Sequence, residues 1–256
     1  MARRGAKSYD GRIAVVSGAS SGLGRQLAVD LAARGATVTA VARREELLRD
    51  LGLAYEVCDV SDEIAWRKVL AGVEDEHGRI DVLVNAAGIE RRAGADDVTV
   101  DDVRGTMAVN FEAVVVGTLA VLPGMLGRGE GIVCNVSSDH GRAPGPGTPA
   151  YCASKAAVSA FTESLAHEVR SRGLHLHVLY PGWVPTALGQ GAVENGMRLP
   201  PRAVRRTEEQ VSTLTLERLG GSRVEINAAR LPTIAPVVRA IAPRAYAAGM
   251  RRAARQ

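Results

Sequence analysis

The stretch that determines the fold is Ile13-Ala14-Val15-Val16-Ser17-Gly18-Ala19-Ser20-Ser21-Gly22-Leu23-Gly24. Its first residues are mostly apolar and rich in valine, which predicts a buried strand, and apolar residues at helical spacing follow up to Arg34. The three glycines let the backbone turn sharply and approach a ligand closely. Free N–H groups at the start of the following helix can bind a pyrophosphate. The stretch therefore predicts a dinucleotide site formed by Gly18, Ser20, Ser21, Gly22, Leu23 and Gly24; the alternative is a glycine-rich turn without a ligand.

Strands and helices alternate along most of the chain. Further strands are predicted at Thr37–Ala42, Ala54–Cys58, Val82–Asn85, Ile132–Val136, Leu174–Tyr180 and Arg223–Ile226. Helices are predicted at Leu23–Arg34, Arg44–Leu51, Ile64–His77, Val100–Leu126, Ala150–Arg172 and Thr207–Leu219. Apart from Arg223–Ile226, these strands are short and nearly continuous in apolarity, which is typical of parallel sheets built from βαβ units. We therefore expect an α/β fold: a single domain with a doubly wound, Rossmann-type parallel sheet of about seven strands flanked by helices.

Length and composition agree with one domain, since the chain has 256 residues, of which 46% are hydrophobic, and a net charge of +4. Residues 1–10 are predicted to be a basic N-terminal tail, 11–227 the catalytic domain and 228–256 a Pro/Arg-rich C-terminal extension. Within the domain, residues 187–206 show no clear element and are expected to form a substrate loop.

The charge pattern and the apolar runs limit the possible partners. The basic residues are mostly arginines spread along the chain, so we do not expect nucleic-acid binding. No apolar run reaches the roughly 18–20 residues of a membrane span. The basic N-terminus is not followed by the apolar stretch of a signal peptide, so a cytoplasmic protein is expected.

Cys58, Cys134 and Cys152 share no metal-ligand spacing; we expect buried core residues and no metal.

Residues at the ends of the next strands indicate which dinucleotide is bound. An NAD site would place a carboxylate near residue 42 to accept a bond from the ribose hydroxyl. The sequence instead has Ala42 followed by Arg43 and Arg44, which suits the 2′-phosphate of NADP(H) and makes NAD(H) the weaker candidate; alternatively, the arginines only begin a solvated helix. Asp59 and Val60 follow the third strand, where a carboxylate can bond adenine. Small residues end the fourth strand, where the backbone can contact adenosine: Asn85, Ala86, Ala87 and Gly88.

Catalytic groups are predicted at Tyr151, Lys155 and Ser138. The i,i+4 spacing of Tyr151 and Lys155 places a phenol and an ammonium on one helix face. A nearby cation makes a tyrosine usable as an acid or base, because it stabilises the phenolate, and the same ammonium can bond a ribose. Ser138 follows the fifth strand, thirteen residues before Tyr151, and can donate to the oxygen of a reacting carbonyl.

With these motifs in order, residues 11–186 resemble the short-chain dehydrogenase/reductase family, in its short single-domain branch. The resemblance implies that Asn110 holds a water for proton relay with Lys155. It also implies that the segment Pro181-Gly182-Trp183-Val184-Pro185-Thr186 binds the nicotinamide, through the Val184 backbone and the Thr186 side chain. The C-terminus departs from the family pattern and resembles hydroxysteroid- or retinol-type members. Tetramer assembly is therefore in doubt, and a homodimer through helices 100–126 and 150–172 is expected.

Three functions remain open at this point. The first is a carbonyl reductase or alcohol dehydrogenase that transfers a hydride between NADP(H) and a carbonyl carbon, with Tyr151 as acid/base. The second is an epimerase or dehydratase that uses the nicotinamide transiently, and the third is a non-catalytic dinucleotide sensor. A largely apolar small molecule is expected in a pocket formed by Asp139, His140, Trp183, Leu188, Val193, Met197 and Leu199. For His140, a position in a surface turn is the alternative.

Overall fold

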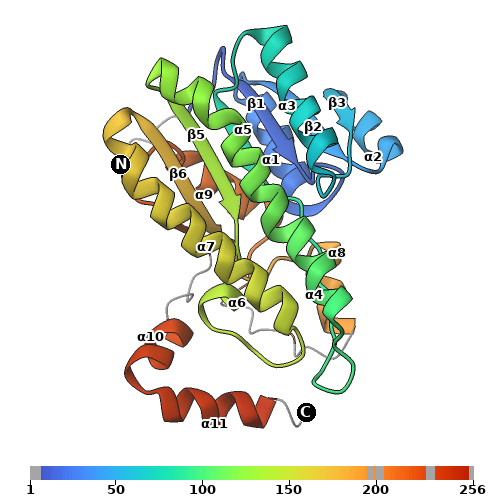
Figure 1. Cartoon of the computed structure of the whole chain (residues 1–256), viewed down its shortest axis with the longest axis vertical. Helices are drawn as coiled ribbons and strands as arrows, with labels where there is room; N and C mark the ends of the chain where they lie inside the picture. Colours follow the sequence, from blue (N-terminus) through green and yellow to red (C-terminus); the bar gives the residue numbers. More distant parts are fainter. Residues whose placement is uncertain (1–6, 195–198, 200–204, 229–233, 254–256) are drawn as a thin grey trace.

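The computed structural model describes residues 7–194, 199, 205–228 and 234–253 (Figure 1). In this part of the chain, seven strands form one sheet in the order β3-β2-β1-β4-β5-β6-β7, and all neighbouring pairs are parallel. The strands are β1 (Ile13–Ser17), β2 (Thr37–Ala42), β3 (Ala54–Val57), β4 (Val82–Asn85), β5 (Gly131–Val136), β6 (Leu174–Tyr180) and β7 (Glu225–Asn227). The predicted doubly wound parallel sheet is confirmed. The order reverses between β1 and β4, where such folds open a ligand crevice.

Helices cover both faces of the sheet. On one face lie α1 (Gly22–Ala33) and α9 (Glu208–Arg218), and on the other lie α3 (Glu63–His77), α5 (Ala113–Arg128) and α7 (Pro149–Val169). Successive strand residues point to opposite faces, so Val16 packs in the core beneath α1 and Val15 packs in the core that contains Trp66. The shorter helices are α2 (Glu45–Arg49), α4 (Val100–Met107), α6 (Asp139–Arg142), α8 (Ala187–Glu194), α10 (Ile234–Ile241) and α11 (Pro243–Ala253).

The long helix predicted at Val100–Leu126 is interrupted by a π-helical segment, η1 (Ala108–Glu112), and continues to Arg128, where Gly129 adopts a positive φ of 69°. By length and composition this continuous stretch could cross a membrane, contrary to the expectation that no segment would. However, Val121 and Met125 are buried in the core against the sheet. Since the core helix of a folded domain has the same composition, the stretch is not evidence for a membrane span.

Predicted and observed elements differ mainly in the last third of the chain. The strand predicted at Arg223–Ile226 is β7, which begins two residues later and ends one residue later, at Glu225–Asn227. The expectation of no element in 187–206 is wrong for Ala187–Glu194, which form α8. The Oγ1 of Thr186 accepts a hydrogen bond from the N–H of Gly189 and thereby caps this helix. Two glycines within α8 concealed its periodicity.

Both ends of the chain carry contacts that were not predicted. Tyr9, assigned to the basic tail, is buried, and its hydroxyl donates to the carbonyl of Leu216 at 2.7 Å. Residues just before the expected boundary at residue 11 are therefore part of the packed domain. The C-terminal extension forms α10 and α11, which lie at the lower end of the molecule in Figure 1. Cys58, Cys134 and Cys152 are free and buried, as predicted for core residues.

Candidate active site

A cavity of about 540 Å³ opens at the carboxyl ends of the strands, on both sides of the point where the strand order reverses. This volume is typical of small-molecule sites. Most of the predicted cofactor residues line it: Gly18, Ser20, Ser21, Gly22, Leu23, Arg43, Arg44, Asp59, Val60, Ala86, Ala87, Gly88, Tyr151, Lys155, Pro181, Gly182, Val184 and Thr186. The fold thus assembles segments that are far apart in the sequence around one space.

The turn after β1 fits tightly between the ends of β1 and β4. Gly18 has a positive φ of 70°, and a Cβ atom there would lie 2.6 Å from the backbone nitrogen of Ala87. The Oγ of Ser17 accepts hydrogen bonds from the N–H groups of Ala86 and Ala87 at 3.2 and 3.3 Å. Ser21 precedes α1 without a side-chain cap, so the first N–H groups of this helix are available to a ligand. The turn fits a bound pyrophosphate.

Two residues predicted for the cofactor serve the packing of the site instead. Gly24 lies outside the cavity lining because it packs against the backbone of Gly18, so its missing side chain is needed for the turn. Asn85 is also outside the lining, since its side chain points into the core and donates to the Oδ1 of Asn135 at 2.8 Å. A glycine or asparagine near a ligand turn does not reveal from its type alone whether it faces the ligand.

Arg43 and Arg44 both lie at the cavity but have different partners. The Nη2 of Arg44 donates to the Oγ atoms of Ser20 and Ser21, each at 2.8 Å, so its guanidinium lies over the glycine-rich turn. Arg43 is largely exposed and pairs with Asp59, with the nitrogen 3.5 Å from a carboxylate oxygen. The reading of these arginines as only the start of a solvated helix is therefore incomplete, because both side chains border the cavity.

Asp59 closes the same end of the cavity. Burial acts to raise the pKa of its carboxyl, but hydrogen bonds from Ser61 and the positive charge of Arg43 outweigh it, and the pKa is lower than usual. The Oδ1 of Asp59 accepts from both the N–H and the hydroxyl of Ser61. The carboxylate is therefore ionised at neutral pH and held in a fixed position, as a hydrogen-bond acceptor for a ligand amino group requires.

Ser138, Tyr151 and Lys155 line the cavity together, from the end of β5 and the first turns of α7. Burial is the main cause that raises the pKa of Tyr151, and a hydrogen bond with Ser138 acts in the opposite direction. The Nζ of Lys155 lies 5.8 Å from the centre of the Tyr151 ring. The phenol is therefore protonated at neutral pH, next to a serine hydroxyl and an ammonium group.

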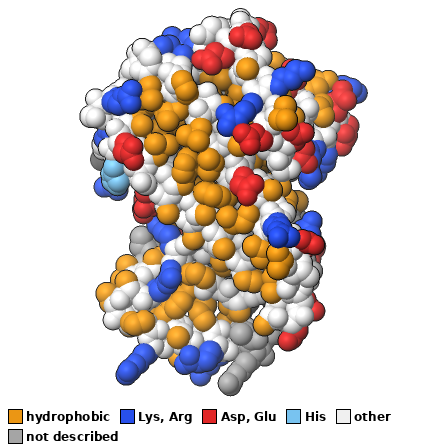
Figure 2. Space-filling model, viewed as in Figure 1, with side chains coloured by type: hydrophobic (Ala, Val, Ile, Leu, Met, Phe, Trp, Pro, Cys, Tyr) orange, Lys and Arg blue, Asp and Glu red, His pale blue; other side chains and the backbone are white. Residues whose placement is uncertain are grey.

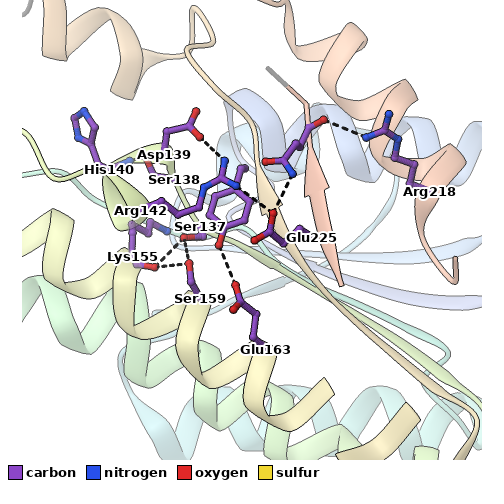
Figure 3. Close-up of polar contacts among 12 residues, drawn as sticks. Ser137, Ser138, Asp139, His140, Arg142, Lys155, Ser159, Glu163, Arg218 and Glu225 are labelled. Carbon is purple, nitrogen blue, oxygen red and sulfur yellow. Dashed lines mark hydrogen bonds and ion pairs between the residues drawn. The ribbon is translucent and has the colours of Figure 1, made fainter. Parts of the chain in front are cut away.

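Contacts with the end of β5 and within α7 hold Lys155 in place. Its Nζ donates to the carbonyl of Val136 at 2.8 Å, and burial lowers its pKa to about 8. Its carbonyl accepts from the Oγ of Ser137 at 2.8 Å, and Ser137 in turn contacts Ser159, as Figure 3 shows. This serine pair holds the first turns of α7 against the end of β5.

Asn110 lies in the π-helical segment η1 and is fully buried. Its Oδ1 accepts from the N–H of Ile89 at 2.8 Å, and its Nδ2 donates to the carbonyl of Ile89 and to the Oγ of Ser154. It does not line the cavity itself. In these contacts Asn110 positions the loop after β4 beside Lys155; its role in a proton relay stays a prediction.

The predicted substrate residues divide into two groups. His140, Trp183, Leu188 and Asp139 line the cavity, but the Asp139 carboxylate is bound to the Nη2 of Arg142 at 2.7 Å (Figure 3). Val193 lies outside the lining. Leu199 is exposed, and Met197 lies outside the described residues.

His140 is not in an exposed surface turn. Its ring makes an edge contact with the Tyr151 ring, with centres 6.0 Å apart, and its buried Nδ1 has no hydrogen-bond partner among the described residues. Burial is the main cause that lowers its pKa, so the ring is neutral at pH 7. The indole nitrogen of Trp183 is buried as well, and the described part of the chain offers it no hydrogen-bond partner.

Sequence reasoning missed Glu90 and Ala235 in the cavity lining. Burial raises the pKa of Glu90, and its carboxylate lies 3.7 Å from the guanidinium of Arg92. Its position two residues after Gly88 was the available signal, because a charged residue directly after a strand-end turn lies near the ligand crevice. Ala235 belongs to α10, and no signal in the sequence connected the C-terminal extension to this site.

Comparisons with known proteins agree with this geometry. The model of the short chain dehydrogenase family matches residues 12–196. A short chain dehydrogenase of Pseudocercospora fijiensis is 40% identical over 190 residues, which span 70% of this chain and 62% of that protein. A short-chain dehydrogenase structure from Streptomyces avermitilis has a TM-score of 0.81 and 27% identity, covering 95% of this chain and 98% of the other.

A third protein adds a bound cofactor. It is described as an NAD(P) dependent gluconate 5-dehydrogenase from Beutenbergia cavernae and contains NADP at low occupancy. It superimposes with a TM-score of 0.75 and 32% identity, over 86% of this chain and 96% of the other. The fold, the family match and the joint position of Ser138, Tyr151 and Lys155 lead to one conclusion. The chain belongs to the short-chain dehydrogenase/reductase family.

Proposed function

We propose that this oxidoreductase interconverts a ketone and a secondary alcohol with NADP(H). The observation that carries the proposal is the joint position of Ser138, Tyr151 and Lys155 in one cavity with the glycine-rich turn. The nicotinamide supplies or accepts the hydride when bound. The side chains of the cavity must then donate and accept the proton of the reaction.

In the reducing direction, the carbonyl oxygen gains a proton while its carbon gains the hydride. The Ser138 hydroxyl donates a hydrogen bond to this oxygen and stabilises the charge that develops on it. Tyr151 transfers the phenol proton to the oxygen, and Lys155 keeps a positive charge beside the resulting phenolate. In the oxidising direction the same proton returns to Tyr151.

The proposed preference for NADP(H) rests on Arg43 and Arg44. No carboxylate stands between Val41 and Arg44. Both arginines line the cavity, with the Arg44 guanidinium beside the glycine-rich turn and that of Arg43 beside Asp59. Arginine is well suited to a 2′-phosphate because it forms charge-assisted, often bidentate hydrogen bonds. The NADP found in the Beutenbergia cavernae protein agrees with this proposal.

The proposed substrate is a largely apolar small molecule that carries at least one polar group beside the reacting carbon. Trp183 and Leu188 supply apolar surface, and hydrogen bonds come from the ring nitrogens of His140 and Trp183 that have no partner in the described part of the chain. We also propose a cytoplasmic homodimer through α4, α5 and α7, since exposed apolar side chains lie on two of these helices, at Val100, Val103 and Leu119. Sedimentation equilibrium would test the dimer.

The experiment that tests the reaction is a panel of ketones with NADPH and of secondary alcohols with NADP⁺. We expect net loss or gain of the reduced-nicotinamide absorbance, with formation of the matching alcohol or ketone. Product formation without any net change of nicotinamide would instead indicate an epimerase or dehydratase. Tight cofactor binding with no product from any class would indicate a dinucleotide sensor.

A further inference from the structure

Helix α10, in the C-terminal helix pair α10 and α11, presents an apolar stripe that the described residues leave exposed. Ile234, Val237 and Ile241 follow the i, i+3, i+7 spacing of a single helix face. They are 56%, 48% and 78% exposed. Figure 2 shows hydrophobic side chains gathered at this end of the molecule, with Lys and Arg side chains at the rim. An apolar stripe of this kind on an end helix indicates an interaction surface.

The opposite side of the helix pair holds it to the domain. The Nη1 of Arg239 donates to the carbonyl of Arg142 at 2.7 Å, and the hydroxyl of Tyr246 donates to the carbonyl of Pro144 at 2.6 Å. Both acceptors lie at or just after the end of α6. These bonds tie Arg239 and Tyr246 to the domain, whereas Ile234, Val237 and Ile241 make no such contact and are exposed.

The charge of this segment is strongly one-sided. Residues 228–256 contain six arginines and no aspartate or glutamate, although the whole chain has a net charge of only +4. Three of these arginines, Arg244, Arg251 and Arg252, are exposed on α11. A second copy of this segment would bring arginine against arginine, so the charge disfavours self-association and favours an anionic partner. Exposed apolar residues next to a purely cationic surface are typical of helices that lie in the interface of an anionic membrane.

We propose that α10 and α11 dock this protein onto the surface of anionic lipid bilayers, with Ile234, Val237 and Ile241 inserted among the lipids. The arginines of α11 would then contact the headgroups. Ala235, in the first turn of α10, also lines the active-site cavity, so docking would bring the cavity close to the lipid phase. The proposal rests on this surface and not on the reaction that the enzyme catalyses.

The test is cosedimentation of the 256-residue chain with vesicles of phosphatidylglycerol or of phosphatidylcholine. We expect binding to the anionic vesicles that weakens as salt is raised, and at least about tenfold weaker binding to the zwitterionic ones. The double variant Ile234→Gln/Ile241→Gln should reduce the partition coefficient on anionic vesicles at least about tenfold, because each substitution removes apolar surface from the bilayer. Arg251→Ala/Arg252→Ala should reduce it by about fivefold per arginine.

Matched controls lie elsewhere on the surface. Ile64→Gln replaces an isoleucine that is 80% exposed on α3, and Arg104→Ala removes an exposed arginine from α4. Neither should change vesicle binding, and thermal unfolding should show that every variant is folded. Equal binding of the wild type to both vesicle types, or no binding to either, would overturn the proposal. So would a fall in oligomer mass, rather than in vesicle binding, on substitution of Ile234 and Ile241, since a second copy would then cover the stripe.

Discussion

The ammonium of Lys155 donates a 2.8 Å hydrogen bond to the carbonyl of Val136, the last residue of β5. This bond fixes the charge at the point where the strand ends and the cavity begins. Burial lowers the pKa of Lys155 from 10.5 to about 8, because water cannot solvate the ammonium there. Its buried position lets the ammonium stabilise a phenolate at Tyr151. The same burial destabilises the folded protein, because the charge is removed from water.

This cost predicts a pH dependence of stability. Below about pH 8 the folded and unfolded states both hold the Lys155 proton, so burial of the charge is fully unfavourable. Between about pH 8 and 10.5 the unfolded state binds more protons, so stability rises with pH. Relative to Lys155→Met, the wild type should gain about 3 kcal/mol over this window. Urea unfolding of both proteins at several pH values measures the gain, and parallel curves would contradict it.

Tyr151→Phe should lower kcat at least about a hundredfold while cofactor affinity stays within about threefold, since only the transferable proton is lost. Stopped-flow binding and steady-state kinetics measure the two quantities separately. Tyr55→Phe is the control, because Tyr55 is a partly exposed tyrosine whose hydroxyl contacts Glu45, away from the cavity. Turnover of the Tyr151 variant within about threefold of wild type would show that another group supplies the proton.

Gly18→Ala and Gly52→Ala separate backbone strain from steric overlap. Both glycines have a positive φ, 70° and 64°, so each alanine is strained by about 1–2 kcal/mol. Only at Gly18 would the added Cβ also overlap a neighbour, the backbone at Ala87, while nothing lies within 4 Å of it at Gly52. We expect Gly18→Ala to cost about 2 kcal/mol more in unfolding free energy and to weaken cofactor binding. An equal loss of unfolding free energy in both variants would mean that the turn after β1 shifts to accommodate the added Cβ atom.

Local patterns were sufficient to predict the inner strands of the sheet, because each of them is a short and mostly apolar run next to a helix with its own periodicity; the edge strand β7, Glu225–Asn227, has one apolar residue and was placed less well. They were also sufficient for Tyr151 and Lys155, whose spacing fixes them on one face of α7. The direction of a side chain is a tertiary property, and Asn85 points into the core only because Asn135 lies on the neighbouring strand. The same holds for Ala235, which reaches the cavity through a fold-back of the C-terminus that no local signal encodes.

The positions of Arg43 and Arg44 sharpen the expected preference between the two nicotinamide cofactors. NADP(H) should exceed NAD(H) at least tenfold in kcat/KM, since guanidinium–phosphate hydrogen bonds contribute about 1.5–3 kcal/mol. Arg44 is anchored to Ser20 and Ser21, whereas Arg43 is only loosely paired with Asp59. Both single alanine variants should therefore lose part of the preference, and Arg43→Ala/Arg44→Ala should lose nearly all of it.

Kinetics with NAD(H) provide the internal control for this double variant, because they should stay within about threefold of wild type if the arginines act on the phosphate alone. Arg49→Ala is a matched variant, as Arg49 pairs with Glu45 on the exposed side of α2 and should leave the preference unchanged. Raised salt should reduce the preference of the wild type, since Arg43 is 66% exposed and its charge is screened. A wild type that prefers NAD(H), or a preference that survives the loss of both arginines, would assign cofactor choice to other residues of the cavity.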